Sequence, residues 1–182
     1  MSNITTIILV AGKSSRFKSN KSKIFNELAG LPIINHIYNT AFKISKNNII
    51  FVCNKKNINS LKKIFPKCKF TIQKKQNGTA AAVLSAKKLI KQNTHILVLF
   101  GDSPLVTVGS LKKLYKNFQK NNFIGSMLAF KATNPSGYGR VITEGKNVKS
   151  IIEEIHANSD IREIKLCNSG ILLCTYKSLF SF

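Results

Sequence analysis

The chain is predicted to be an α/β protein with a Rossmann-like, doubly wound and mainly parallel sheet. Short apolar runs, typical of buried strands, alternate with segments of about 10–15 residues in which apolar side chains recur at helical spacing. The first run, residues 7–10, leads directly into a loop of small and basic residues. In open α/β folds such a loop lies at the carboxyl end of a strand, which is where ligands bind. Residues 1–182 are expected to form one domain, since single domains typically contain about 100–200 residues.

The apolar pattern places the elements in order along the chain. It predicts strands at residues 7–10, 48–53, 70–72, 95–100 and 124–130, and helices at residues 33–44, 58–65, 79–90 and 107–120. Pro32 can start the first helix because its missing N–H would be unpaired there anyway, and Pro66 ends the second helix. From residue 131 onward the pattern loosens into loops and short strands, one of them expected at residues 161–167.

Charge and cysteine content limit the classes of partner and compartment. The net charge of +22 comes from 29 Lys and Arg against 7 Asp and Glu. Such a charge invites a nucleic-acid partner, but the lysines run along the whole length and the only arginines are Arg16, Arg140 and Arg162. Since base readout favours arginine, no specific nucleic-acid partner is expected. No run approaches the about 20 apolar residues of a membrane span, so no membrane partner is expected either. The four cysteines follow no metal-ligand spacing and are expected to be free thiols in the cytoplasm.

The loop after the first strand has the composition of a phosphate-binding loop. Gly12 lets a ligand approach the backbone N–H groups, and Lys13 and Arg16 supply positive charge for phosphate oxygens. A Walker A motif is excluded because the position five residues before Gly12 is Ile7, inside the strand. A dinucleotide fingerprint is excluded because it needs three spaced glycines. An ordinary basic strand-to-helix turn would contain the same residues.

Asp102 is the candidate metal ligand. It is the only carboxylate between Glu27 and Glu144, and it directly follows an apolar run. Mg²⁺ prefers a carboxylate plus substrate phosphates to an all-protein cage. An aspartate at the carboxyl end of a strand, facing a basic loop, therefore predicts a site for a metal–triphosphate complex. The alternative is an aspartate that caps the turn before Pro104.

Polar groups in two further regions are candidates for binding a base and a sugar. The amide of Gln73 offers a donor and an acceptor side by side, which matches the edge of a pyrimidine, and backbone groups around Gly78 could add to this; a solvated loop glutamine is the alternative. Glu153 ends an apolar run and Asn168 stands between two others. Carboxylate and amide groups bind sugar hydroxyls, although any polar strand end has the same composition. The glycines of residues 137–140 allow backbone contact with a ligand, and a plain hairpin fits them equally well.

Six short motifs occur in a fixed order between residues 7 and 173. They are L-V-A-G-K-S-S-R-F (9–17), L-A-G-L-P (28–32), Q-K-K-Q-N-G-T (73–79), L-F-G-D-S-P-L (99–105), P-S-G-Y-G-R-V (135–141) and N-S-G-I (168–171). These resemble, in the same order, the motifs L-A-A-G-K-G-T-R-M, L-A-G-x-P, Q-x-x-Q-x-G-T, Y-G-D-x-P-L, P-T-G-Y-G-R-I and N-T-G-I of bacterial N-acetylglucosamine-1-phosphate uridylyltransferases. Each motif is weak by itself, whereas six in register are a specific signal.

The resemblance implies a nucleotide-diphospho-sugar transferase fold. It also implies the transfer of a uridylyl group from UTP to a sugar 1-phosphate, in this family N-acetylglucosamine 1-phosphate, with release of pyrophosphate. By their positions in the motifs, the implied residues are Ala11, Gly12, Gln73, Gly78 and Thr79 for uridine; Lys13, Arg16 and Lys23 for the triphosphate and catalysis; Gly139, Glu153 and Asn168 for the sugar; and Asp102 for Mg²⁺.

The chain departs from the family pattern in three places. Ser14 and Ser15 replace the Gly and Thr of the first loop, and the segment E-x-K-D-A reads E-E-I-H-A at residues 153–157, which leaves the identity of the sugar open. The family's second metal-ligating asparagine and its acetyltransferase β-helix would lie beyond Phe182, so a C-terminally truncated domain is expected. Two alternatives remain: a related nucleotidyltransferase such as a cytidylyltransferase, and a nucleotide-binding remnant without turnover. The sequence does not indicate an oligomeric state.

Overall fold

The computed structural model of the chain describes residues 3–12, 22–75 and 77–181. The fold divides into two compact units. Unit 1 comprises Met1–Ser126 together with Leu172–Phe182, and unit 2 comprises Met127–Ile171. The predicted residues Lys13 and Arg16 lie outside the described residues.

Unit 1 is built on a mainly parallel sheet with the strand order β5-β4-β1-β6-β10. Its strands are β1 (Ile4–Leu9), β4 (Ile49–Cys53), β5 (Lys69–Ile72), β6 (His95–Phe100) and the last residues of β10 (Leu166–Thr175). β1 lies between β4 and β6 and is parallel to both, and β5 is parallel to β4. β10 pairs with β6 in the antiparallel sense. The four strands predicted in this part of the chain are therefore present, with β1 starting three residues earlier than expected.

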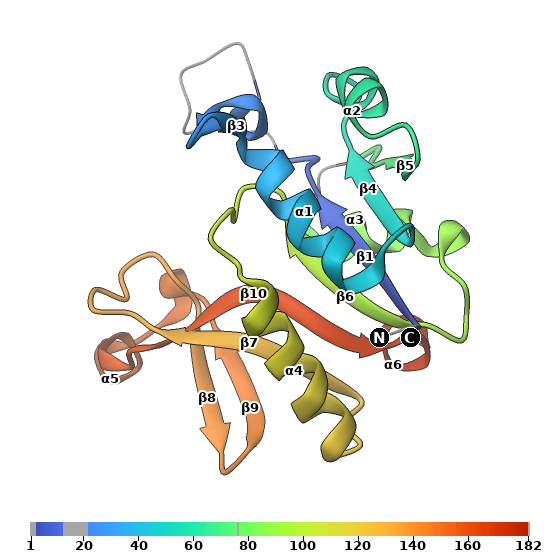
Figure 1. Cartoon of the computed structure of the whole chain (residues 1–182). Helices are drawn as coiled ribbons and strands as arrows, with labels where there is room; N and C mark the ends of the chain where they lie inside the picture. The colour runs from blue at the N-terminus through green and yellow to red at the C-terminus, as the bar shows by residue number, and fades with distance from the viewer. Residues whose placement is uncertain (1–2, 13–21, 76, 182) are drawn as a thin grey trace. The chain divides into compact units, whose positions relative to one another are not determined.

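Helices cover both faces of the unit 1 sheet. They are α1 (Ile33–Ser45), α2 (Ile58–Ile64), α3 (Gly78–Ser85), α4 (Val108–Lys120) and α6 (Tyr176–Phe180). Figure 1 shows α1 in front of the strands and α3 behind them. Because side chains alternate along a strand, Ile7 of β1 packs with Val83 of α3 on one face, in a buried cluster that also contains Val98 of β6. The helix predicted through residue 90 ends at Ser85 and continues as a 3-10 turn, Lys87–Leu89.

Unit 2 contains antiparallel strands and one short helix. β8 (Arg140–Glu144) and β9 (Asn147–Ile152) form a hairpin, β8 pairs with β10 at Cys167, and β7 (Gly125–Lys131) also pairs with β10. The loop between β8 and β9 contains Gly145 in the left-handed region, with φ of +58°.

The strand expected at residues 161–167 is wrong in its first half. Helix α5 (Ser159–Glu163) lies there, and β10 begins only at Leu166. Asn158 caps α5, because its Oδ1 accepts a hydrogen bond from the N–H of Ile161 at 3.0 Å. Asp160 in the first turn and Arg162 in the last suit the helix dipole. These local interactions outweigh the strand propensity of the isoleucines.

The described cysteines are free, and three of them are buried: Cys53, Cys167 and Cys174. Burial raises the pKa of both Cys53 and Cys174 to about 12, and that of the less buried Cys68 to about 11. At neutral pH these three thiols are therefore protonated. Among the helices that the structure describes, none is long and apolar enough to cross a membrane.

Candidate active site

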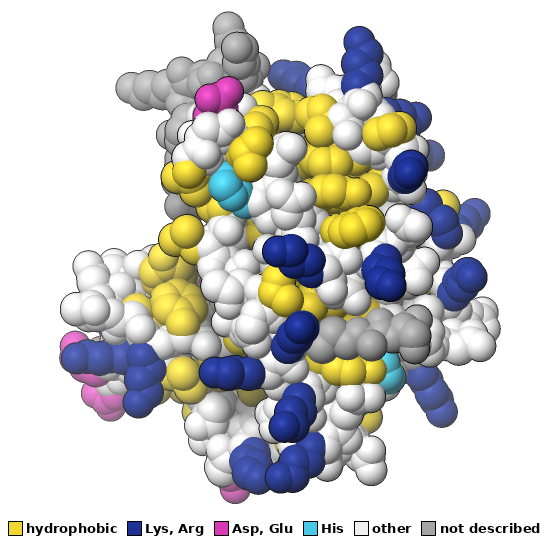
Figure 2. All heavy atoms as spheres, viewed as in Figure 1, with side chains coloured by type: hydrophobic (Ala, Val, Ile, Leu, Met, Phe, Trp, Pro, Cys, Tyr) yellow, Lys and Arg dark blue, Asp and Glu magenta, His cyan; other side chains and the backbone are white. Residues whose placement is uncertain are grey.

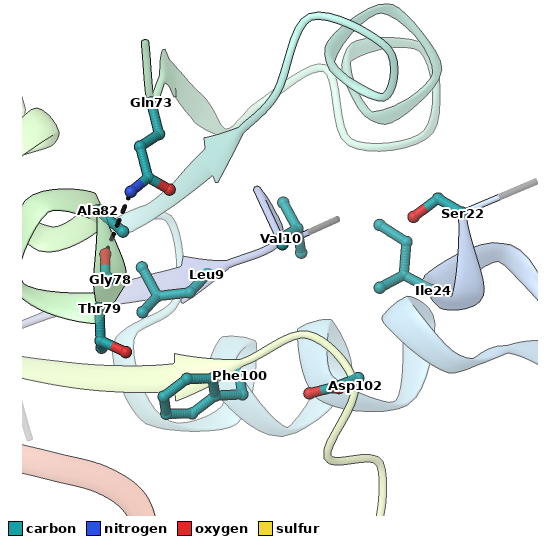
Figure 3. A pocket seen from close by; sticks show the side chains of 11 residues that line it. Leu9, Val10, Ser22, Ile24, Gln73, Gly78, Thr79, Ala82, Phe100 and Asp102 are labelled. Atoms are coloured by element: carbon teal, nitrogen blue, oxygen red, sulfur yellow. Dashed lines mark hydrogen bonds between the residues drawn. The ribbon is translucent and has the colours of Figure 1, made fainter. Parts of the chain in front are cut away.

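A cavity of about 390 Å³ lies at the carboxyl ends of the parallel strands of unit 1 (Figure 3). It is lined by Leu9, Val10, Gly12, Ser22, Ile24, Gln73, Gly78, Thr79, Ala82, Phe100 and Asp102. Five of the residues predicted for the nucleotide and the metal are among them: Gly12, Gln73, Gly78, Thr79 and Asp102. Parallel strands end at the same edge of a sheet, which is why loops distant in the sequence converge there.

Ala11, also predicted to bind uridine, is positioned differently. Its side chain is buried in the core cluster that contains Ile7, and its carbonyl accepts a hydrogen bond from Asn54 Nδ2 at 3.2 Å. Any contribution of Ala11 to ligand binding would therefore come from its backbone.

Two asparagines fix the end of β1. Asn57 is almost fully buried, and its Nδ2 donates to the carbonyl of Val10 at 2.7 Å. Its Oδ1 accepts from the N–H of Asn54 at 3.0 Å, and Asn54 Oδ1 in turn accepts from the N–H of Asn57 at 3.1 Å. Buried polar groups are stable only when paired in this way. Neither residue was predicted from the sequence; their signal was a pair of asparagines three positions apart directly after a predicted strand.

Gln73 is held rigidly at the wall of the cavity. Its side chain is buried, with an exposure of 8%, so the alternative of a solvated loop glutamine is wrong. Its backbone N–H donates to the carbonyl of Cys53 at 2.9 Å, and its Nε2 donates to the carbonyl of Gly78 at 3.1 Å. Figure 3 shows Oε1 of Gln73 turned away from Gly78, on the side of the cavity. The amide therefore presents an acceptor to a ligand.

Gly78 and Thr79 begin α3, so the amino end of this helix borders the cavity. Gly78 has φ of +84°, a left-handed conformation that is strained for any residue with a Cβ. Helix amino termini carry unpaired N–H groups and a partial positive charge, which favours anions. The cavity therefore combines an amide acceptor at Gln73 with a site suited to negative charge.

Asp102 lines the cavity and pairs with Lys23, which is itself not among the lining residues. Lys23 Nζ lies 3.5 Å from Asp102 Oδ2, and the two side chains are 37% and 49% exposed. Asp102 directly follows Gly101, which has no room for a side chain because a Cβ there would collide with Val10. The N–H of Gly101 donates to the carbonyl of Leu9 at 3.0 Å. The close approach of these two strand ends is what places Asp102 at the cavity.

The residues predicted for the sugar lie together in unit 2. A Cβ at Gly139 would be 3.0 Å from Glu153 Oε1, so the carboxyl group of Glu153 rests against the Gly139 backbone. The N–H of Asn168 donates to the carbonyl of Gly139 at 2.8 Å, and Asn168 Oδ1 accepts from the N–H of Gly170 at 2.7 Å. Unit 2 therefore clusters a carboxylate, an amide and glycine backbone, which are groups that can bind sugar hydroxyls.

The positive charge is distributed unequally between the units. Unit 1 holds 23 of the 29 Lys and Arg and 2 of the 7 Asp and Glu, a net charge of +21, whereas unit 2 has a net charge of +1. Figure 2 shows the basic side chains scattered over the face in view and not gathered in one patch. Such a surface attracts anions over a distance.

Comparison with known proteins identifies the family. The family model of the MobA-like NTP transferase domain matches residues 6–163. The bifunctional protein GlmU of Buchnera aphidicola subsp. Acyrthosiphon pisum is 40% identical over 177 residues, which are 97% of this chain and 38% of that protein. The bifunctional protein GlmU of Campylobacter fetus is 40% identical over 174 residues, which are 93% of this chain and 39% of that protein. The chain thus spans about two fifths of the length of these relatives.

A solved structure agrees with this assignment at the level of the fold. A protein of Bacillus anthracis, named a glucose-1-phosphate thymidylyltransferase and solved with sucrose, superposes with a TM-score of 0.82 at 17% identity, over 97% of this chain and 73% of that one. The predicted doubly wound fold and the resemblance carried by the six motifs are confirmed. The chain belongs to the MobA-like NTP transferase domain family.

Proposed function

We propose that the chain transfers a uridylyl group from UTP to a sugar 1-phosphate, specifically N-acetylglucosamine 1-phosphate, with release of pyrophosphate. One observation carries the proposal: the cavity of unit 1 combines a fixed amide acceptor, a helix amino terminus and the carboxylate of Asp102, which pairs with Lys23. A base, a chain of phosphates and a metal ion need these three kinds of group. The relatives named GlmU support the same reaction.

Gln73 is assigned to the base. Its Oε1 is available to accept a hydrogen bond from the N3–H of uracil, because Nε2 is already used on the carbonyl of Gly78. The backbone at Ala11 and Gly12, together with Gly78 and Thr79, would complete the uridine site. Purines are larger and carry a different pattern of donors and acceptors at the corresponding edge, so ATP fits less well.

Lys23 is assigned to the phosphates, with Lys13 and Arg16 as further cations. Asp102 fits a magnesium ion in the mode that uses one carboxylate with substrate phosphates and water. The described residues contain no group of three His, Cys, Asp or Glu that would form an all-protein cage. Mg²⁺ bound by Asp102 would neutralise charge on the triphosphate. Gly139, Glu153 and Asn168 are assigned to the sugar.

The reaction needs no nucleophilic side chain. A phosphate oxygen of the sugar 1-phosphate attacks the α-phosphorus of UTP, and a new P–O bond forms. The bond from the α-phosphorus to the oxygen that bridges to the β-phosphate breaks, and pyrophosphate leaves with that electron pair. The residues of the chain act by positioning both substrates and by stabilising negative charge, which are the usual contributions in phosphoryl-type transfers. We place this activity in the cytoplasm, where free thiols stay reduced.

A coupled assay tests the proposal. Phosphorus NMR of the chain with UTP, Mg²⁺ and N-acetylglucosamine 1-phosphate should show pyrophosphate and UDP-sugar in equal amounts. UTP without the sugar phosphate should give no pyrophosphate. Release of pyrophosphate from CTP but not from UTP would show that the chain is a cytidylyltransferase and not a uridylyltransferase. If the chain binds nucleotides but releases pyrophosphate from none of these mixtures, it is a nucleotide-binding protein and not an enzyme.

A further inference from the structure

Unit 2 contains a buried arginine that the proposed reaction does not use. The side chain of Arg140 is 1% exposed, although an isolated charge in such a position is strongly unfavourable. Its guanidinium donates through Nη1 to the carbonyl of Tyr138 and through Nη2 to the carbonyl of Arg162 at 3.2 Å. Its charge is balanced by Glu154, whose Oε2 lies 2.8 Å from Nη1. Arg140 therefore connects the loop before β8, the turn after β9 and helix α5.

The carboxylate of Glu154 has two close donors and one longer ion-pair partner. Oε2 accepts from Arg140 and from the N–H of Gly137 at 3.2 Å, and Oε1 lies 3.8 Å from Nε of Arg162. The hydrogen bond from Arg140 is the main reason why the pKa of Glu154 is held below its usual range. Glu154 remains ionised at neutral pH and closes the loop over Gly137 onto the turn after β9.

This arrangement determines the direction of the neighbouring carboxylate. Glu153 and Glu154 are adjacent, but within the described residues the ion pairs of unit 2 are made by Glu154 and not by Glu153. The carboxyl group of Glu153 instead lies against Gly139. In the sequence, Gly139 lies between Arg140 and Tyr138, and the carbonyl of Tyr138 accepts a hydrogen bond from Arg140. The hydrogen bonds and ion pairs of Arg140 and Glu154 thus hold Gly139 and Glu153 in place through their neighbours in the sequence.

We propose that Arg140 and Glu154 are positioning residues that set the affinity for the sugar 1-phosphate and leave the affinity for the nucleotide unchanged. This inference rests on the assignment of Gly139, Glu153 and Asn168 to the sugar. Neither residue of the pair touches substrate in this scheme. Arg140 holds the carbonyl of Tyr138 and Glu154 holds the N–H of Gly137, so each fixes one side of the glycine loop. A charge pair with several fixed partners suits this role because a guanidinium has donors in a rigid plane.

Binding measurements on the full chain separate this role from a general structural one. In Glu154→Gln, the ion pair is removed but a similar volume is kept; in Arg140→Lys, the charge is kept but the planar donors are lost. Calorimetry should show at least a tenfold rise of the Kd for N-acetylglucosamine 1-phosphate in both variants. The Kd for UTP should stay within twofold of the wild type, which also shows that unit 1 is folded. Arg162→Gln is the control, because it removes only the longer contact to Glu154, and its Kd for the sugar phosphate should change less than twofold.

The outcomes distinguish the inference from the proposed reaction. If the wild type binds UTP but not N-acetylglucosamine 1-phosphate, the proposed acceptor is wrong and the inference falls with it. If the wild type binds the sugar phosphate and both variants bind it equally well, the reaction stands and the positioning role is refuted. If the Kd values for UTP and the sugar phosphate rise together in both variants, the pair only stabilises the fold. A tenfold change confined to the sugar phosphate supports the inference.

Discussion

At the scale of single residues, Asp102 carries the strongest prediction. Asp102→Asn keeps the shape of the side chain but removes the charge that a magnesium ion requires, so we expect turnover at matched Mg²⁺ to fall by roughly 10²-fold or more. The carboxyl group is about half exposed, so the thermal unfolding midpoint should change little. Asp160→Asn, the same change at an exposed position of α5, is the control for activity. Turnover near that of the wild type in Asp102→Asn would show that Asp102 does not bind the metal.

Gly139 is a second test of a single position. A Cβ would approach Glu153 Oε1 to 3.0 Å, and the flexible carboxyl end would have to move. We expect Gly139→Ala to raise KM for the sugar 1-phosphate about tenfold, which corresponds to the loss of one hydrogen bond of about 1.4 kcal/mol. KM for UTP should not change.

Gly109→Ala provides the matched control for that substitution. Gly109 lies in α4, where a Cβ would meet nothing closer than 3.8 Å, so the change should leave both KM values unaffected and stabilise the helix by about 0.5–1 kcal/mol. An unchanged sugar-phosphate KM in Gly139→Ala would remove Gly139 and Glu153 from the sugar site.

Residues that line the cavity were easier to find in the sequence than residues that hold others in place. Gln73 and Asp102 could be predicted because an amide and a carboxylate directly after apolar runs match known ligand chemistry. Asn57 and the Arg140–Glu154 pair could not, because their roles depend on partners 47 and 14 positions away in the chain. No local pattern in a sequence shows which distant carbonyl or carboxylate a buried polar side chain will meet.

At the scale of elements, the segment from Gln73 to the start of α3 should determine the choice of base. We expect kcat/KM for UTP to exceed that for ATP by roughly 10²-fold, because each buried polar group left unpaired by the wrong base costs about 1–3 kcal/mol. Gln73→Ala should reduce this ratio about tenfold or more. Gln92→Ala, at an exposed glutamine, should leave it unchanged. Equal kcat/KM values for ATP and UTP in the wild type would refute the assignment of this segment to the base.

Glu154, in the turn after β9, should make the stability of unit 2 depend measurably on pH. The pKa of Glu154 is lowered below its ordinary value of 4.5 by Arg140 in the folded state. A lowered folded-state pKa contributes stability that is fully present above the ordinary value and is lost as the pH falls through the folded value. The difference in unfolding midpoint between the wild type and Glu154→Gln should therefore be constant near neutral pH and shrink below about pH 4.5.

Glu163→Gln is the control for that measurement. Glu163 is exposed at the end of α5 and takes part in none of the ion pairs of the described residues, so its substitution should produce no comparable difference at any pH. A gap between the wild type and Glu154→Gln that persists unchanged to pH 3 would mean that the ionised carboxylate is not what stabilises the turn.

Elements with a strong periodic pattern were predicted well, and those governed by local caps were not. The strands of unit 1 follow from continuous apolar runs, and α4 from helical spacing after Thr107, whose side chain caps it at the N–H of Ser110. Residues 161–167 contain two β-branched isoleucines, Ile161 and Ile164, but Asn158 offered the backbone a capped helical turn there. In a segment of five residues, one cap outweighs the small difference between helix and strand propensities.

At the scale of the whole molecule, the uneven charge predicts how the affinity for each of the two substrates will depend on salt. Unit 1 carries +21 and unit 2 only +1, although the sequence shows lysines along the whole chain. UTP is strongly anionic and is assigned to unit 1. The acceptor carries one phosphate and is assigned to the nearly neutral unit 2. Long-range attraction should therefore matter mainly for UTP.

We expect the Kd for UTP to rise about tenfold or more between 0.1 and 1 M KCl, because the Debye length falls from about 10 Å to about 3 Å over this range. Calorimetry without Mg²⁺ avoids turnover and any competition between ions for the metal site. The Kd for uridine, which has the base but no phosphates, should hardly change, and the Kd for N-acetylglucosamine 1-phosphate should rise by no more than two- to threefold. If UTP proved as insensitive to salt as uridine, the scattered lysines would have no part in binding the triphosphate, and short-range contacts such as the one proposed for Lys23 would have to supply its affinity alone.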